Sequence, residues 1–179
     1  GSTIQASKPG TRFGKKVVLD DNGNRLVFAQ NGIVVCPSTP CPYYYANSTS
    51  YVYDWDGNSW TQKGGTLSAT SASSYGVDID ISGDGSTVAI GGGLDLNADN
   101  LRTGSVKTFR LVNDAWSPVG QTVYGEAEFD EAFYVALNKT GDVLAHGAHK
   151  NDLAGEDAGQ LKVYDLVDDS WTQRGATLK

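Results

Sequence analysis

The chain has 179 residues, a formal net charge of −7, and 39% hydrophobic against 20% charged residues. An acidic chain repels phosphate backbones and anionic lipid surfaces, so nucleic acid and membrane surfaces are poor candidate partners. No apolar run approaches the ~18 residues that a membrane helix needs, so we expect no membrane insertion.

The first residues carry no fold signal. The chain contains no methionine and starts with Gly1-Ser2, which is typical of the remnant of a cleaved expression tag. We therefore assign residues 1–12 to this remnant and an N-terminal lead.

The first repeat is predicted over residues 13–67. Apolar strands at 17–19 and 26–28 flank Asn22-Gly23, and an Asn-Gly pair between apolar runs is the strongest short-range signal for a hairpin. Tyr53 lies in the expected third strand, and Trp60 begins the fourth. We name these four strands A to D.

The connection between strands B and C of this repeat carries two cysteines. Cys36 and Cys41 lie five residues apart in a proline-rich segment, which favours a short disulfide and a location outside the reducing cytosol. Two free thiols are the alternative. Sequons at Asn47 and Asn138 agree with secretion, because they are potential glycosylation sites.

The same pattern returns twice, over residues 68–123 and 124–179. Trp60 is followed at the same place in the pattern by Trp116 and Trp171, at spacings of 56 and 55 residues, and an aromatic residue stands seven positions before each tryptophan. A fixed period of this size indicates a solenoid, propeller or array.

Each repeat contains four short strands and nothing that resembles an amphipathic helix. We therefore predict an all-β fold of tandem four-stranded antiparallel blades of a β-propeller. The alternative is a β-trefoil, which closes with three repeats of four strands.

Short motifs at the strand ends resemble those of FG-GAP repeats, the blades of the integrin α-subunit head. Phe13-Gly14 and Tyr75-Gly76 open the first two repeats, and Gly147-Ala148-His149 follows strand B of the third. The third repeat departs from the pattern, with Glu131-Ala132 where Phe-Gly is expected. The resemblance implies a degenerate three-blade propeller segment with adhesion as its function.

Three blades are too few to close a ring, because propellers close with about 4 to 8 blades. We therefore expect either a homodimer that completes the ring or a segment of a larger propeller.

The long, irregular connections all lie on the face that carries the B–C and D–A loops, and binding residues concentrate on such loops. We expect a ligand there. The candidate ligand-binding residues are Tyr43, Tyr44, Tyr45, Asp95, Asn97, Asp99, Arg102, Asn151, Asp152, Glu156 and Asp157. The alternative is that these side chains are solvated surface.

Calcium is at most an accessory ligand. Asp80, Ser82 and Asp84 offer alternating oxygens before Gly85, as in a calcium-binding turn, but the last ligand position is Val88. A plain β-turn explains the same residues. We expect no other cofactor.

No catalytic constellation is apparent. His146 and His149 would point to opposite faces of one strand, and no serine or cysteine is set in a nucleophile motif. His146 aligns with Phe28 and Ile90, which are expected packing positions, so we expect it to be buried or at the rim of the blade. The sequence therefore predicts a non-catalytic extracellular module, secreted or on the cell surface, that recognises a protein or a glycan. The alternatives are a glycan-active enzyme that uses loop carboxylates, and a structural element whose main contact is with further blades.

Overall fold

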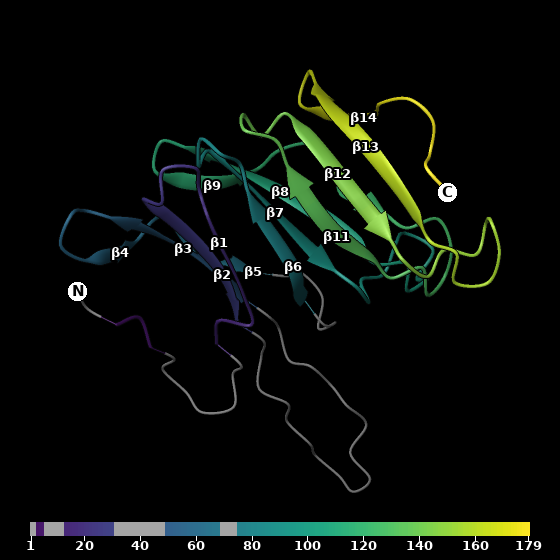
Figure 1. Cartoon of the computed structure of the whole chain (residues 1–179), viewed down its shortest axis with the longest axis horizontal. Coiled ribbons are helices and arrows are strands. Elements are labelled where there is room, and N and C mark those ends of the chain that lie inside the picture. Colours follow the sequence, from purple (N-terminus) through teal and green to yellow (C-terminus); the bar gives the residue numbers. More distant parts are fainter. Residues whose placement is uncertain (1–2, 6–12, 31–48, 69–74) are drawn as a thin grey trace, which may run out of the picture.

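The computed structural model describes residues 3–5, 13–30, 49–68 and 75–179, and every regular element within them is a β-strand. The strands form three antiparallel sheets, one for each predicted repeat, and none of the three is closed. The sheets stand side by side in chain order, with sheet 2 in the middle (Figure 1). The prediction of an all-β chain is therefore confirmed.

Sheet 1 has the order β1-β2-β3-β4, with β5 beside β3. Its strands are β1 (Lys16–Leu19), β2 (Arg25–Gln30), β3 (Thr49–Trp55), β4 (Trp60–Gln62) and β5 (Leu67–Ser68). Sheet 2 has the order β10-β8-β7-β6, with β9 beside β8. Its strands are β6 (Tyr75–Ile81), β7 (Thr87–Gly92), β8 (Ser105–Val112), β9 (Ala115–Pro118) and β10 (Val123–Tyr124).

Sheet 3 has the order β11-β12-β13-β14. Its strands are β11 (Ala132–Leu137), β12 (Val143–Ala148), β13 (Gln160–Val167) and β14 (Ser170–Gln173). Sheets 1 and 2 each extend one residue beyond the predicted repeat boundaries at 67 and 123. Within the described residues no strand pairs with a strand of another repeat. The β-trefoil alternative was wrong, because a trefoil pairs strands of its three repeats in one barrel.

The first hairpin of each sheet is set by a glycine in the turn. Gly23, Gly85 and Gly141 have φ values of +68°, +73° and +68°. Glycine adopts this left-handed conformation without a steric penalty, so each turn closes tightly and fixes the register of the two strands.

Two apolar cores lie between the sheets. Alternate residues along each strand point to opposite faces, so the middle sheet contributes to both cores. The buried residues of the first core come from sheets 1 and 2 and are Val27, Ala29, Val52, Leu67, Ile79, Ile81, Val88 and Ile90. Those of the second come from sheets 2 and 3 and are Ala89, Val106, Val123, Leu144, Tyr164 and Trp171.

Two further expectations concern the histidines and membrane-spanning helices. His146 is buried, as predicted from its alignment with Phe28 and Ile90, whereas His149 lies beyond the end of β12 and is exposed. The described part of the chain contains no helix long and apolar enough to span a membrane.

Candidate functional site

Three loops lie together at one end of sheets 2 and 3. They are the β7–β8 loop (93–104), the β10–β11 loop (125–131) and the β12–β13 loop (149–159). Backbone hydrogen bonds join the first to the second, from Phe129 N to Arg102 O at 2.8 Å and from Gly125 N to Gly104 O at 3.2 Å. We call the three loops together the loop platform.

The carboxylate of Asp130 is the centre of this platform. Asp130 is only 2% exposed, and its Oδ2 accepts hydrogen bonds from Glu126 N, Ala127 N and Asn151 Nδ2 at 2.9 to 3.0 Å. A buried carboxylate is stable only when such donors replace its water shell. Asp130 therefore fixes the β10–β11 loop and joins it to the β12–β13 loop.

The residue before Asp130 is held in a strained conformation. Phe129 has a φ of +70° and is 54% exposed. A bulky residue at positive φ is an outlier that persists only where the surrounding structure enforces it, and such residues cluster at functional sites. The neighbouring hydrogen bonds of Phe129 N and Asp130 supply that enforcement, so the phenyl ring is displayed at the surface.

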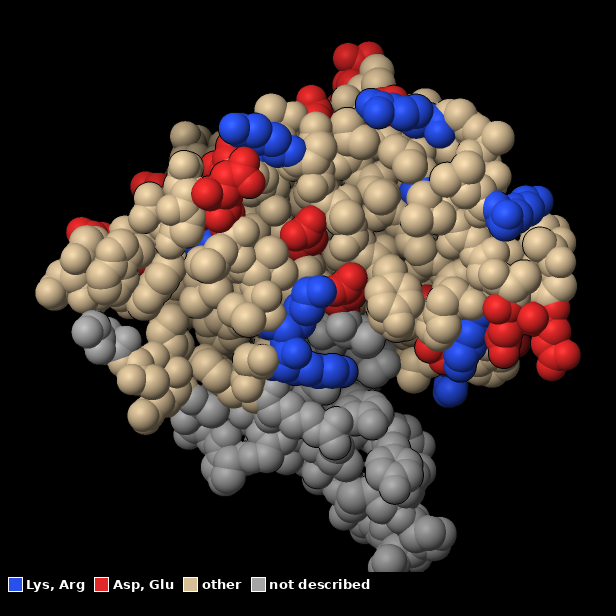
Figure 2. All heavy atoms as spheres, in the orientation of Figure 1, with Lys and Arg blue, Asp and Glu red and all other residues tan. Residues whose placement is uncertain are grey.

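The platform combines exposed apolar and acidic side chains. The exposed large apolar residues are Leu96, Leu101, Phe129 and Leu153. The exposed acidic residues are Asp99, Glu126, Glu128, Asp152, Glu156 and Asp157. Figure 2 shows acidic side chains gathered at the end of the molecule where the β12–β13 loop lies. The surface is therefore suited to a ligand with apolar and cationic groups.

Two lysines are paired at the margins of the platform. Lys150 Nζ lies 2.6 Å from Glu131 Oε1, and this hydrogen bond raises the pKa of Lys150. Glu126 pairs with Lys162, and the hydrogen bond between them holds the pKa of Glu126 below its usual value. Lys150 also interacts electrostatically with Asp157, so this lysine offsets part of the acidic charge of the β12–β13 loop.

Two of the predicted ligand residues, Asp95 and Asn151, are buried and order the loops. Asp95 is buried, and its Oδ2 accepts a hydrogen bond from Ser105 Oγ at 2.6 Å. Asn151 is also buried, and besides its bond to Asp130 its Oδ1 accepts a hydrogen bond from Leu153 N. Their burial and hydrogen bonds indicate a role in ordering the loops, and ligand binding by these two residues stays a prediction from the sequence.

The other predicted ligand residues of these loops remain at or near the surface. Asn97 Oδ1 accepts hydrogen bonds from Asp99 N and Leu101 N, and Asp152 Oδ1 accepts one from Asp157 N, so both order their own turns. The exposed members of the set are Asp99, Arg102, Asp152, Glu156 and Asp157.

The predicted calcium ligands point to different places. Asp80 Oδ2 accepts a hydrogen bond from Leu137 N of sheet 3 at 2.7 Å, whereas Asp84 Oδ1 accepts hydrogen bonds from Ser82 Oγ and Ser86 N. Across the described ranges, no three His, Cys, Asp or Glu residues come together as metal ligands. The Asp80 carboxylate thus lies in the sheet 2–sheet 3 contact, and burial there raises its pKa.

Several predicted features are not described or are already occupied. Tyr43, Tyr44, Tyr45, Cys36, Cys41 and Asn47 lie outside the described residues. Asn138 is described, and its Nδ2 donates hydrogen bonds to Thr140 Oγ1 and Asp142 Oδ1. Glycosylation of Asn138 replaces one of the two Nδ2 hydrogens, so the folded chain would lose at least one of these bonds.

Sequence reasoning missed the display of Phe129 and the anchoring role of Asp130. The available signal was Phe129 itself, an aromatic residue inside the acidic segment 126–131. Nothing in the spacing of that segment reveals which side chain turns inward.

No protein-family model and no curated protein matches the chain. Among solved structures, it is similar to the crystal structure of the eukaryotic initiation factor, with a TM-score of 0.55 and 10% identity over 99% of this chain and 36% of that one. It is also similar to the crystal structure of the tricorn protease, with a TM-score of 0.51 and 13% identity over 86% of this chain and 14% of that one. At these identities the likeness concerns the fold alone, and the chain spans a minor part of either protein.

Proposed function

We propose that the chain is a non-catalytic binding module whose loop platform holds a protein ligand. The observation that carries this proposal is Phe129, an exposed aromatic side chain at positive φ beside the buried anchor Asp130. An aromatic side chain on a rigid base supplies contact area with little loss of conformational entropy on binding.

The charge of the platform suggests the chemistry of the ligand. The three loops expose acidic and apolar side chains together, so the complementary ligand surface has basic and apolar groups. Binding that depends on exposed charges weakens as salt rises, because the Debye length falls to about 8 Å at physiological ionic strength.

The fold and the location of the protein belong to the same proposal. The three sheets are propeller blades of the FG-GAP kind, and the chain acts outside the cell, secreted or at the cell surface. The support for the blades is the repeat of four antiparallel strands around each of the three hairpins. The support for the location is the pair Cys36 and Cys41 together with the sequon at Asn47.

The test is a binding screen against arrays of extracellular proteins and of glycans, followed by variants. We expect the screen to return protein ligands. Their affinity should fall at least about tenfold, or 1.4 kcal/mol, in Phe129→Ser. It should also fall as the salt concentration rises. The matched control is Val167→Ser, which changes an exposed apolar residue of β13 away from the platform.

Two results would contradict the proposal. Binding that survives both Phe129→Ser and the double variant Glu156→Gln with Asp157→Asn would place the ligand elsewhere. Glycan ligands that are lost with Phe129→Ser would keep the platform as the site but change the class of ligand.

A further inference from the structure

The two contacts between sheets are built from the same pair of faces. In each contact, the earlier sheet presents a face of smaller side chains and the later sheet presents a face of larger ones. The larger face includes Ile79, Ile81, Val88, Ile90, Phe109 and Trp116 in sheet 2, and Val135, Leu137, Leu144, Tyr164, Leu166 and Trp171 in sheet 3. The smaller face includes Val27, Ala29, Val52 and Leu67 in sheet 1, and Ala89, Val106 and Val123 in sheet 2.

In each contact, a tryptophan of the later sheet packs against a glycine of the earlier sheet. A Cβ at Gly64 would lie 2.7 Å from Trp116 Cδ1, and a Cβ at Gly120 would lie 2.4 Å from Trp171 Cδ1. Each indole also donates a hydrogen bond to the preceding sheet, from Trp116 Nε1 to Lys63 O and from Trp171 Nε1 to Thr108 Oγ1. The glycine is required because a side chain would occupy the space of the indole.

The turns of successive sheets are also joined in the same manner. Asp21 N donates to Gly83 O at 3.0 Å between sheets 1 and 2, and Asp84 N donates to Lys139 O at 2.8 Å between sheets 2 and 3. The same contact is therefore repeated between successive sheets. Each sheet carries the smaller-residue half of the contact on one face and the larger-residue half on the opposite face.

Among the described residues, nothing covers the small-residue face of sheet 3. Gly175 has a φ of +69°, close to the +68° of Gly64 and Gly120, yet no described atom lies within 4 Å of a Cβ built on it. Leu178 stands seven residues after Trp171, as Leu67 and Val123 stand after their tryptophans. Those two are buried between sheets, whereas Leu178 is 62% exposed.

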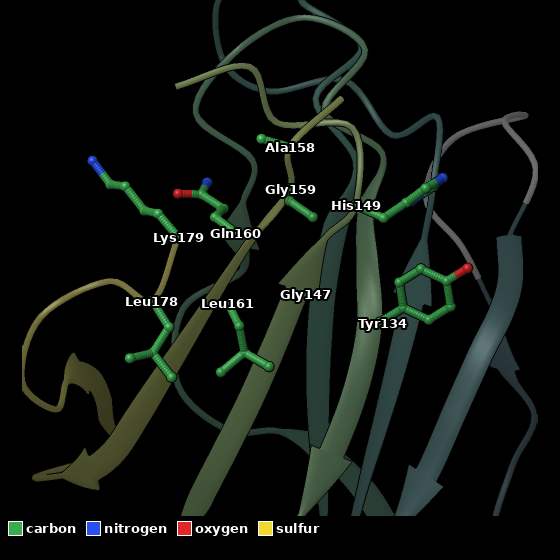
Figure 3. Close-up of a pocket in the computed structure, with 10 residues that line it drawn as sticks. Tyr134, Gly147, His149, Ala158, Gly159, Gln160, Leu161, Leu178 and Lys179 are labelled. Carbon is green, nitrogen blue, oxygen red and sulfur yellow. The ribbon is translucent and has the colours of Figure 1, made fainter. Parts of the chain in front are cut away.

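The same face contains a hollow of about 380 Å³ (Figure 3). Its lining includes Gly147, Leu161 and Leu178, and the last two pair through backbone hydrogen bonds. Gly91 holds the matching position in sheet 2, where a Cβ would lie 1.8 Å from Phe133 O of sheet 3. The hollow therefore corresponds to the place that the first strand of a following sheet occupies.

The large-residue face of sheet 1 is not covered by any other described sheet. Val17 and Leu19 are 56% and 51% exposed, although their equivalents in sheet 2, Ile79 and Ile81, are buried against sheet 1. Trp60 lies on this face beside Trp55, at a centroid distance of 5.4 Å. Within the described residues, Trp60 Nε1 has no acceptor on another sheet, unlike Trp116 and Trp171.

We propose that the open face of sheet 3 binds the open face of sheet 1 of a second copy of this chain, head to tail. Trp60 of the second copy takes the place on Gly175 that Trp171 takes on Gly120. A second copy is the occupant because the chain carries both complementary halves of a contact that it already forms twice. Two copies bring six such sheets together and satisfy both open ends in one closed symmetric pair.

The test is the mass of the chain in solution, measured by sedimentation and light scattering from low to high micromolar concentration. We expect twice the monomer mass of 19.0 kDa at the upper end of the series. Leu178→Lys on sheet 3 and Leu19→Lys on sheet 1 should each return the chain to 19.0 kDa. Leu153→Lys, which changes an exposed leucine of the loop platform, is the matched control and should leave the dimer intact.

A mixture of the two variants distinguishes the direction of pairing. Each variant retains one intact face, so a head-to-tail contact predicts that the mixture forms dimers while neither variant does so alone. Far-UV circular dichroism checks that each variant folds. If a lysine variant does not fold, Leu19→Ser or Leu178→Ser takes its place, with the same expected loss of the dimer. A wild-type chain that stays monomeric, or a dimer that survives Leu178→Lys, overturns the proposal.

Discussion

Trp171 lies so close to Gly120 that a methyl group on the glycine would come within 2.4 Å of the indole Cδ1. The indole Nε1 donates a 2.8 Å hydrogen bond to Thr108 Oγ1, and Thr108 Oγ1 in turn donates to Val119 O. Gln121 adds two hydrogen bonds with the backbone of Trp171. One aromatic residue thus joins sheet 3 to the last strands of sheet 2.

Removing the indole should destabilise the chain strongly. Trp171 is 4% exposed, so Trp171→Ala leaves a large cavity between two sheets and should lower the free energy of unfolding by about 3–5 kcal/mol. Trp171→Phe retains most of the aromatic contact and loses the hydrogen bond to Thr108. This variant should therefore lower the free energy of unfolding by about 1–3 kcal/mol. Urea unfolding followed by tryptophan-independent circular dichroism measures both. Equal losses in the two variants would show that the hydrogen bond, not the buried area, dominates.

Gly120 should tolerate no side chain. Gly120 and Gly23 share a φ of +68°. Of the two, Gly120 has an indole against its Cα, whereas no atom of the described residues lies within 4 Å of a Cβ at Gly23. In both alanine variants the left-handed backbone conformation destabilises the folded chain by about 1–2 kcal/mol. Only Gly120→Ala also displaces Trp171. We therefore expect Gly120→Ala to melt clearly below Gly23→Ala in thermal unfolding. Equal melting temperatures would mean that the indole moves aside freely.

Much of the fold could be predicted from the sequence, because strand periodicity and turn chemistry are local. Asn22-Gly23 and the tryptophan period located the hairpins and the fourth strands, and the alignment of His146 with Ile90 predicted its burial. These signals depend on residues close together in the chain or on a regular repeat.

The site was less predictable, because the direction of a loop side chain depends on neighbouring loops. Asp95 and Asn151 have the same chemistry as exposed ligand residues, yet both point inward to bond Ser105 and Asp130. Asp80 and Asp84 are spaced like calcium ligands, but the sheet 2–sheet 3 contact turns Asp80 away. Phe129 has no local pattern that reveals its positive φ.

The cysteine pair lies outside the described residues, so the disulfide stays a prediction from sequence. Cys36 and Cys41 enclose residues 37–40, which include Pro37 and Pro40, and Pro42 follows Cys41. We expect intact-mass spectrometry of non-reduced protein to show about two hydrogens fewer than after reduction. Labelling of unreduced protein with a thiol reagent is the control, and a count of two reactive thiols would contradict the bridge.

His146 should make the stability of the chain depend on pH. Its side chain is 3% exposed, and burial lowers the pKa of the imidazole from its usual 6.5 to about 4. A hydrogen bond with the backbone of Ala132 opposes this change, and the positive charge of Lys162 reinforces it. The folded chain therefore keeps His146 neutral at a pH where an unfolded chain would protonate it.

The direction of this pH dependence follows from the number of protons bound by the folded and the unfolded chain. Between pH 6.5 and pH 4 the unfolded chain binds more protons at this position than the folded chain, so the free energy of unfolding falls as pH falls through that range. From pH 7.5 to pH 5 the loss due to His146 should be about 2 kcal/mol. The carboxylates with lowered pKa values, such as Asp84 and Glu126, start below this range and contribute little to it.

The matched variant is His146→Ile, because Ile90 occupies the equivalent position in sheet 2. It removes the titrating group and also a buried Nε2 that has no hydrogen-bond partner among the described residues. We expect urea unfolding to give the variant a stability at pH 7.5 no lower than that of the original chain, and a much flatter profile down to pH 5. If the original chain and His146→Ile lose stability in parallel over this range, the titration belongs to other groups and His146 is not held neutral by burial.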